Sequence, residues 1–324
     1  MLFFRNAFLL FFLVLPNSVQ GAESFAAWLS ELRREALGQG IHQATIDSSL
    51  GHLTLLPDVL KKQKRQPEKT RSLDQYLQQI ASPQRVATGR VKMVRHRALL
   101  ERVSRRYQVQ PRFIIALWGV ESDFGQNSGQ TPVVPALATL AFAGQRSDYF
   151  RRELLVALRI LDEGHISFEQ MNGSWAGAMG QCQFMPWNFL RRAVDFNGDG
   201  RRDIWHSTDD VLASIAHFLS KLGWRDDLTW GREVLLPPSL AHETIPKNEQ
   251  KKNLREWQRM GVRRADGTDL PRRPVVASLI RPSRSGGRAF LAYSNYEVLL
   301  KWNRSSSFAL AIGHIADQIK PRIT

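Results

Sequence analysis

One carboxylate at the end of an apolar stretch has the type and setting that could do chemistry. The stretch Gln110 to Gly125 reads QPRFIIALWGVESDFG, and Glu121 is its first acidic residue. Pro111 suits the first turn of a helix, and apolar residues on most faces of the following turns indicate a buried helix. Burial and the nearby negative end of the helix dipole would both raise the pKa of Glu121. Such a residue is suited to general acid catalysis, and the alternative is a helix-end Glu paired with an arginine.

The number of carboxylates limits the mechanism. Glycosidases normally use two carboxyl groups. The nearest companion is Asp123, and residues at i and i+2 do not share a helix face. If Glu121 acts alone, the substrate must supply the nucleophile. The sequence has no HExxH, CxxC, GxSxG, SxxK or phosphate-loop motif, so zinc, serine-nucleophile and nucleotide chemistry are unsupported.

A glycine-rich stretch follows further along the chain. Residues 173–189 read GSWAGAMGQCQFMPWNF, which is a poor helix interior. Its small residues permit close backbone approach, either of another chain segment or of a ligand. Gln181 and Gln183 carry amides that both donate and accept, as sugar hydroxyls require. A tight helix–loop packing site is the alternative.

The stretch DFNGDG, residues 195–200, matches the opening of a calcium loop, with Gly at position 6. Oxygen-bearing side chains stand at positions 1, 3 and 5: Asp195, Asn197 and Asp199. The usual Glu at position 12 is absent, because that residue is His206. Asp209 would close a longer loop, although it also belongs to a good helix N-terminus. A plain turn is the alternative to calcium.

The N-terminus predicts export. Residues 1–21 contain one early arginine, an apolar run and then Pro16 and small residues, which is typical of a secretory signal peptide. A retained membrane anchor is the lesser alternative. The single cysteine, Cys182, lies far from this segment, so it offers no lipid-attachment site there and excludes an intramolecular disulfide. We therefore expect an exported, periplasmic protein.

The net charge of +15 at 324 residues indicates an anionic partner. Export argues against nucleic acid, whereas bacterial cell wall with its peptide carboxylates fits an exported basic protein. The basic run 90–106 is interpreted as a solvated helix face.

The same pieces, taken together, resemble the lytic murein transglycosylase B family of the lysozyme-like superfamily, over roughly residues 25 to 320. The pieces occur in one order: GVESDFG, GSWAGAMGQCQFMP, DFNGDG and SNYEVLLKWN. The resemblance implies a mainly α (α+β) fold with a lysozyme-like helical core. The expected parts are a signal peptide (1–21), an N-terminal helical part (22–75), the core (76–231), a small β-containing insertion (232–292) and C-terminal helices completing the core (293–324).

The resemblance also implies an activity, which is cleavage of the β-1,4 bond between N-acetylmuramic acid and N-acetylglucosamine in peptidoglycan. Glu121 matches the single catalytic acid/base, and the products would carry 1,6-anhydromuramoyl ends. The positions that match residues lining the glycan cleft are Ser174, Gln183, Asn295 and Tyr296. The positions that match a structural calcium site are Asp195, Asn197, Asp199, the Arg201 carbonyl and Asp209. No organic cofactor is implied, and peripheral association with the membrane or with other cell-wall enzymes stays open.

Two positions depart from the family. The family commonly has Tyr-Asn where this chain has Trp302-Asn303, at an aromatic expected to make a polar contact. Cys182 stands where a small polar residue is usual, and we expect a buried, neutral thiol there. Two other functions remain alternatives, a hydrolytic muramidase and a non-catalytic peptidoglycan-binding protein.

Overall fold

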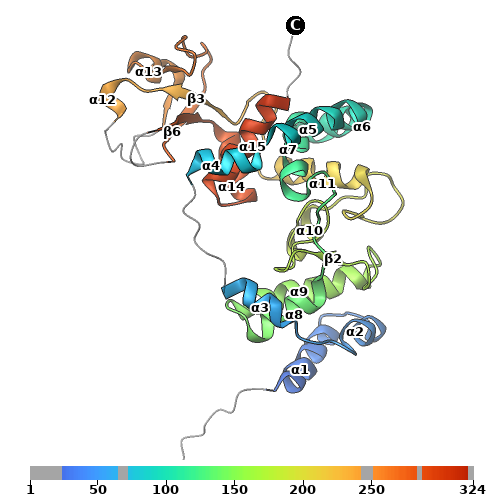
Figure 1. Ribbon diagram of the computed structural model, residues 1–324. Helices are drawn as coiled ribbons and strands as arrows, with labels where there is room; N and C mark the ends of the chain where they lie inside the picture. The colour runs from blue at the N-terminus through green and yellow to red at the C-terminus, as the bar shows by residue number, and fades with distance from the viewer. Residues whose placement is uncertain (1–23, 65–71, 242–250, 283–286, 320–324) are drawn as a thin grey trace, which may run out of the picture.

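The computed structural model describes residues 24–64, 72–241, 251–282 and 287–319, and the fold is mainly α with two small sheets (Figure 1). The predicted fold class is therefore confirmed. The predicted signal peptide, residues 1–21, lies outside the described residues. Within the described ranges, no helix combines the length and the apolar character needed to cross a membrane.

One end of the molecule is built from helices of the N-terminal part and of the middle of the chain (Figure 1). These are α1 (Phe25–Gly38), α2 (Gln43–Leu50), α3 (Pro57–Lys64), α8 (Val133–Ala143) and α9 (Ser147–Asp162). Helices α8 and α9 pack on each other, while α2 contacts α9 and α3 contacts α8. The N-terminal helices thus rest directly on the core, and the predicted boundary at residue 75 stays a prediction.

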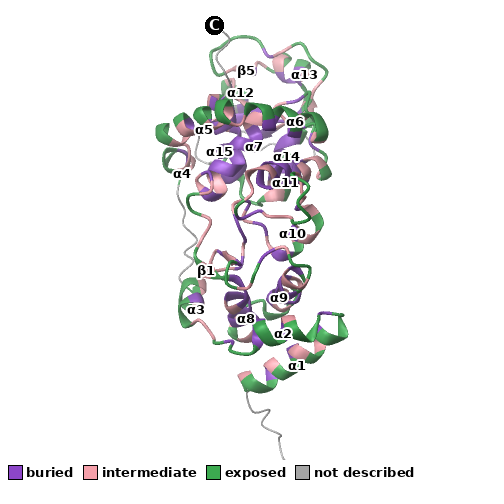
Figure 2. Ribbon diagram, turned by 90° about the vertical axis from the view of Figure 1, so that its right-hand side faces the viewer, coloured by how far each residue is buried: buried purple, intermediate pink, exposed green. Residues whose placement is uncertain are grey.

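The helix that carries Glu121 lies at the centre of the other group of helices. This group contains α4 (Leu73–Ile80), α5 (Pro83–Arg95), α6 (Arg97–Tyr107), α7 (Pro111–Ser122), α11 (Thr208–Lys221), α14 (Ser294–Trp302) and α15 (Ser306–Ile319). Helix α7 contacts α15, α5, α11 and α6, and most of its residues are buried (Figure 2). The prediction of a buried helix is confirmed. The basic run forms α5 and α6, and its Arg90, Arg95 and Arg97 are exposed, as a solvated face requires.

The glycine-rich stretch connects the two groups of helices. It follows the short ladder of β1 (Thr131–Pro132) with β2 (Asn172–Gly173), and it ends in α10 (Pro186–Arg192). Its backbone folds tightly, with Met179 bridged to both Gly173 and Phe184. A Cβ on Gly129 would lie 2.1 Å from the Gly173 carbonyl oxygen. Small residues are therefore needed here because chain segments approach each other closely.

The insertion forms a five-stranded antiparallel sheet in the order β4-β6-β7-β3-β5. Its elements are β3 (Gly231–Leu235), α12 (Pro238–Ala241), β4 (Lys251–Asn253), α13 (Leu254–Arg259), β5 (Arg263–Arg264), β6 (Val276–Ile280) and β7 (Ala289–Ala292). The sheet and α13 enclose a hydrophobic cluster of their own around the fully buried Trp257. The predicted β-containing character of this segment is confirmed.

The insertion joins the helices at a narrow neck, because Gly231 on entry pairs with Ala292 on exit. Trp230, directly before the neck, donates from its indole Nε1 to Asp317 Oδ2 on α15 at 2.9 Å. A Cβ on Gly313 would lie 2.4 Å from the Trp230 ring, so α15 needs glycine there to accept this anchor.

Candidate active site

Glu121 lies in the last turn of α7, and its side chain is only partly exposed. Burial raises its pKa to about 7, while a hydrogen bond from Trp302 acts in the opposite direction. Within the described residues, no arginine or lysine forms an ion pair with Glu121. The geometry therefore supports the predicted proton donor over a salt-bridged helix end.

Trp302, the last residue of α14, is the polar partner of Glu121. Its indole Nε1 donates to Glu121 Oε1 at 2.7 Å. The indole is held by Phe184 and Phe218, whose ring centroids lie 5.5 and 4.8 Å away. The tryptophan that departs from the usual Tyr-Asn pair thus makes a polar contact, directed at the candidate catalytic group.

A left-handed turn directs the chain away after Glu121. Asp123, Phe124 and Gly125 have φ angles of 51°, 59° and 87°. Ser122 Oγ accepts from the Gly125 amide at 3.1 Å, and this bond closes the turn. Glycine is required at 125, because a Cβ there would lie 2.3 Å from Gln181 Oε1.

Asp123 is paired with Arg85 rather than acting as a second carboxylate beside Glu121. Its carboxylate lies 3.5 Å from Arg85 Nε, on a different side of the turn. This agrees with the expectation that residues two apart on a helix point in different directions. Tyr76 on α4 does lie close enough for the charge of Glu121 to raise its pKa, after the larger effect of burial. Sequence reasoning missed Tyr76, because a lone tyrosine on an amphipathic helix gives no signal.

The two glutamines of the glycine-rich stretch hold the chain together around the site. Gln181 accepts from Trp118 Nε1 at 2.8 Å and donates to the Trp205 carbonyl at 2.7 Å. Gln183 donates from Nε2 to the carbonyls of Ser128 and Gly180, at 2.8 Å each. Its amide oxygen makes no hydrogen bond to the described residues. That oxygen is the part of Gln183 available for the predicted glycan contact.

Ser174 also has a structural bond. Its hydroxyl accepts from the Ala178 amide at 3.1 Å, which tightens the loop that follows β2. The side chain is half-buried, and its hydroxyl hydrogen remains available as a donor. A contact between Ser174 and glycan stays a prediction.

Asn295 and Tyr296 lie at the start of α14, and both are buried. Asn295 accepts from the Arg225 amide at 2.8 Å and donates to the carbonyls of Arg225 and Leu228 at 2.7 and 2.9 Å. Burial raises the pKa of Tyr296. In this conformation both residues belong to the buried core, and Asn295 is held by the 225–228 loop, so a glycan contact of either residue stays a prediction.

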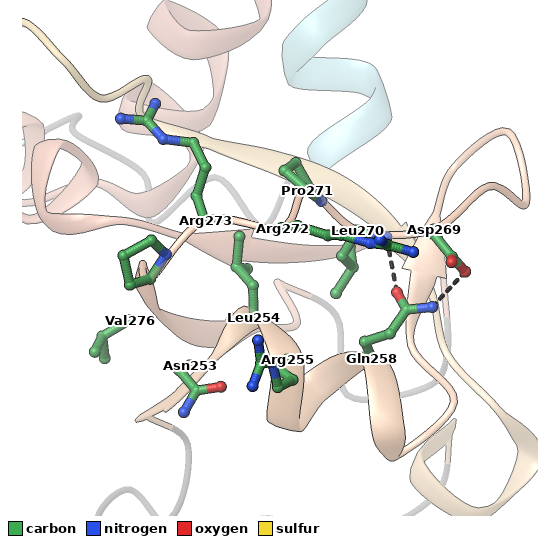
Figure 3. Close-up of a pocket in the computed structure, with 11 residues that line it drawn as sticks. Asn253, Leu254, Arg255, Gln258, Asp269, Leu270, Pro271, Arg272, Arg273 and Val276 are labelled. Carbon is green, nitrogen blue, oxygen red and sulfur yellow. Dashed lines mark hydrogen bonds between the residues drawn. The ribbon is translucent and has the colours of Figure 1, made fainter.

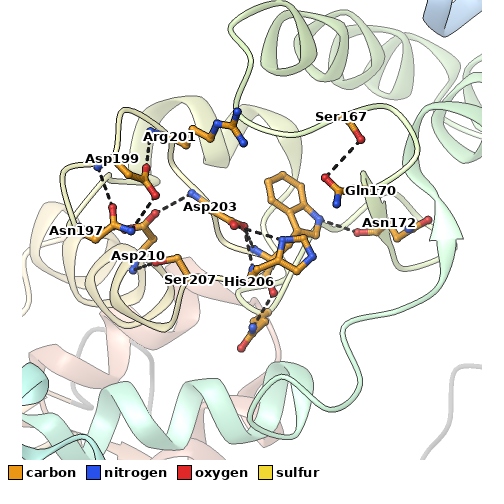
Figure 4. A network of polar contacts seen from close by, with 12 residues as sticks. Ser167, Gln170, Asn172, Asn197, Asp199, Arg201, Asp203, His206, Ser207 and Asp210 are labelled. Atoms are coloured by element: carbon orange, nitrogen blue, oxygen red, sulfur yellow. Dashed lines mark hydrogen bonds and ion pairs between the residues drawn. The ribbon is translucent and has the colours of Figure 1, made fainter.

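The loop 195–200 is folded around its own acidic side chains (Figure 4). Asp195 accepts from the amides of Gly198, Asp199 and Gly200 at 2.7 to 3.2 Å. Asn197 Nδ2 donates to Asp199 Oδ2 at 2.9 Å, and Asp199 Oδ1 accepts from the Arg201 amide at 2.9 Å. The donor set is all oxygen, as a hard cation such as Ca²⁺ requires.

The two aspartates of α11 face different ways. Asp210 is fully buried and accepts from the amides of Phe196 and Asp203, at 2.8 Å each. Asp209 Oδ1 instead accepts a hydrogen bond from Arg102 Nη2 at 3.0 Å. In the described part of the chain, no three acidic, histidine or cysteine side chains converge as a metal site. The loop donors fit calcium in their chemistry, whereas Asp209 fits only after it leaves Arg102.

Cys182 is fully buried, and its Sγ lies 3.5 Å from the Val211 carbonyl. Burial raises the pKa of the thiol well above its ordinary value. The expected neutral, buried thiol is confirmed.

The raised pKa of Glu121 predicts how stability depends on pH. The folded chain retains this proton up to about pH 7, whereas the unfolded chain releases it near pH 4.5, so the carboxyl destabilises the fold increasingly across that interval. We expect Glu121→Gln to raise the melting temperature more at pH 8 than at pH 5, measured by circular dichroism. Glu169→Gln, at an exposed position, is the matched control. Parallel melting curves for Glu121→Gln and wild type across this range would contradict the assignment.

Comparison with known proteins agrees with this geometry. The family model described as the transglycosylase SLT domain matches residues 24–317. The membrane-bound lytic murein transglycosylase B of Escherichia coli K12 is 28% identical over 251 residues, which are 75% of this chain and 66% of that protein. The chain thus spans just under two thirds of that relative.

Solved structures with the same fold extend the comparison. SltB3 from Pseudomonas aeruginosa, solved in complex with NAG-NAM-pentapeptide, is 42% identical with a TM-score of 0.86, covering 92% of this chain and 80% of that one. Escherichia coli Slt35, solved in complex with calcium, is 25% identical with a TM-score of 0.77, covering 90% of this chain and 92% of that one. Because the family model spans nearly the whole described chain, this protein belongs to the transglycosylase SLT domain family.

Proposed function

We propose that this protein is a lytic transglycosylase that cleaves the β-1,4 bond between N-acetylmuramic acid and N-acetylglucosamine in peptidoglycan. The observation that carries the proposal is one buried carboxyl, Glu121, with a pKa of about 7 and an indole donor at 2.7 Å. Membership of the transglycosylase SLT domain family supports it. So does the relative solved with NAG-NAM-pentapeptide.

The first step needs an acid. Protonated Glu121 gives its proton to the glycosidic oxygen as the bond to C1 of the muramic acid breaks. The N-acetyl group of that sugar helps to stabilise the developing positive charge. After the transfer Glu121 is an anion, and the Trp302 indole stabilises it by donating to Oε1.

The second step needs a base at the same place. Ionised Glu121 takes the proton of the C6 hydroxyl of the same sugar, and the C6 oxygen attacks C1. The product carries a 1,6-anhydromuramoyl end and no water is consumed. Asp123 is turned towards Arg85, which supports a mechanism with a single carboxyl group. A pKa near the working pH lets one residue serve both steps.

The partner in this proposal is the glycan strand, contacted by Ser174, Gln183, Asn295 and Tyr296. The net charge of +15 suits a wall with peptide carboxylates, and an exported, periplasmic location follows from the N-terminal sequence. A hydrolytic muramidase would use the same acid but would admit water to C1. A non-catalytic wall-binding protein would have no need of the raised pKa.

The central test replaces the carboxyl group of Glu121, the proposed proton donor, with an amide. Glu121→Gln should keep the fold and abolish digestion of purified sacculi, because an amide delivers no proton, while Glu169→Gln digests them at the wild-type rate. Mass spectrometry of the wild-type products should show ends one water lighter than reducing ends. Reducing ends would instead establish a muramidase, and near-normal digestion by Glu121→Gln would remove that residue from the mechanism.

The hydrogen bond from Trp302 predicts a shift in the pH profile. Trp302→Phe keeps an aromatic side chain but loses the donor to the carboxylate, so the pKa of Glu121 should rise further. We expect the high-pH limb of digestion to move up by about one pH unit, with a lower maximal rate. Trp187→Phe, at an exposed indole, is the control. An unshifted limb would show that the indole does not stabilise the anion.

We also propose that the chain binds a structural calcium ion through Asp195, Asn197, Asp199, the Arg201 carbonyl and Asp209. The ion would supply positive charge that holds the loop on α11. Support comes from the all-oxygen donor set and from the solved calcium complex of Slt35. Binding would replace the contact between Asp209 and Arg102.

Chelation tests the calcium proposal. A chelator should lower the melting temperature of the purified protein, and added Ca²⁺ should restore it. Arg102→Gln should strengthen the binding of Ca²⁺ in calorimetry, because Asp209 loses its competing partner. A melting temperature that is unchanged by chelator, together with no calorimetric heat, would leave the loop as a plain turn.

A further inference from the structure

A cavity of about 830 Å³ lies in the insertion, between the start of α13 and the chain before β6 (Figure 3). We call it the insertion pocket. Leu254 and Leu270 form its buried floor, and the exposed Val276 stands at its edge. The pocket therefore combines an apolar floor with an open mouth.

Three guanidinium groups line this mouth: Arg255, Arg272 and Arg273. Within the described residues, no carboxylate forms an ion pair with Arg255 or Arg272. Asp269 is the one acidic side chain that lines the pocket, and it accepts a hydrogen bond from Gln258 Nε2 (Figure 3). Its carboxylate also lies 3.5 Å from Arg263 Nε. The pocket thus has unneutralised positive charge, which suits an anionic ligand.

The surface of the pocket continues towards α14, the helix whose last residue, Trp302, donates to Glu121. A smaller cavity of about 260 Å³ shares Arg273 and Val276 with the insertion pocket and extends to Ser294 at the start of α14. Arg273 connects the insertion to the loop after α11, since it donates from Nη1 to the Asp227 carbonyl at 3.0 Å. Asn295 holds the same loop through Arg225 and Leu228.

Helix α14 fixes the separation between this surface and the site. It begins at Ser294 and ends at Trp302, the residue that donates to Glu121. Eight steps of 1.5 Å make this about 12 Å. An extended peptide of five residues spans about 17 Å. A peptide attached to a sugar near Glu121 is therefore long enough to span α14 and reach the smaller cavity at Ser294, which adjoins the insertion pocket through Arg273 and Val276.

We propose that the insertion pocket binds the peptide stem of peptidoglycan, with Arg255 and Arg272 receiving its carboxylates. The planar guanidinium group matches a carboxylate with two parallel hydrogen bonds. The apolar floor at Leu254 and Leu270 suits the methyl side chains of alanine residues. The proposal rests on the proposed function, since it assigns part of the same substrate to a second surface.

Direct binding of a sugar-free stem pentapeptide to the full-length protein tests this assignment. The double variant R255Q/R272Q should lower the affinity about tenfold or more in calorimetry, as expected for lost charge-assisted hydrogen bonds. Arg259→Gln is the matched control, because Arg259 is exposed on the same helix but does not line the pocket. Esterified pentapeptide should bind as weakly to wild type as free pentapeptide binds to the double variant.

Three results of this binding experiment would overturn the proposal. The first is equal affinity of the double variant and wild type for the pentapeptide. The second is equal affinity of wild type for the free and esterified peptides. The third is inorganic phosphate that binds wild type as tightly as the peptide does, which would make the pocket a general anion site.

Digestion separates this inference from the proposed activity. The double variant should cut intact sacculi more slowly than wild type, yet cut glycan strands stripped of peptide at the wild-type rate. Equal slowing on both substrates would overturn the role in peptide binding. If wild type cuts neither substrate, the proposed activity fails, and the binding experiment still decides what the pocket recognises.

Discussion

The hydrogen bond between the Trp302 indole and the Glu121 carboxyl is the contact on which the site depends. Burial favours the protonated carboxyl, and the indole favours the anion, so the pKa reaches about 7 rather than a higher value. The two residues come from α14 and α7, which lie far apart in the sequence. The packing of α15 against both helices brings them together, and an edge contact with Phe184 and a tilted contact with Phe218 hold the indole in place.

The surroundings of Glu121 are rigid because their polar groups bond to one another. The Gln181 amide connects Trp118 on α7 with Trp205 beyond the glycine-rich stretch. Gln183 ties that stretch to the chain that follows the turn at residues 123–125, through the Ser128 carbonyl. Such bonds preorganise a site, because the groups around the reacting atoms need not rearrange during the reaction. Amides that sequence reasoning assigned to sugar thus have a prior task in the protein.

Local patterns in the sequence predicted local features well. The apolar run before Glu121 predicted a buried helix and a raised pKa, and Cys182 is the buried thiol expected. The contact from Trp302 could not be derived, because it joins residues 181 positions apart and depends on how α14 meets α7. The direction of a side chain at a helix start was equally inaccessible. Asp209 and Asp210 are neighbours, yet only the packing of α11 decides that Asp210 turns to the loop.

The paired entry and exit of the insertion at Gly231 and Ala292 bring both of its ends to one place, and Arg273 adds a contact with the helical part through the Asp227 carbonyl. The insertion encloses its own hydrophobic cluster around Trp257, while Phe290 and Ala292 of β7 belong to the larger core of the helices. Trp230 anchors the entry to the insertion, because its ring packs on Gly313 and its indole bonds to Asp317, both on α15. Substitutions at the surface of this sheet can therefore alter the insertion pocket while the buried contact between Trp302 and Glu121 keeps its form.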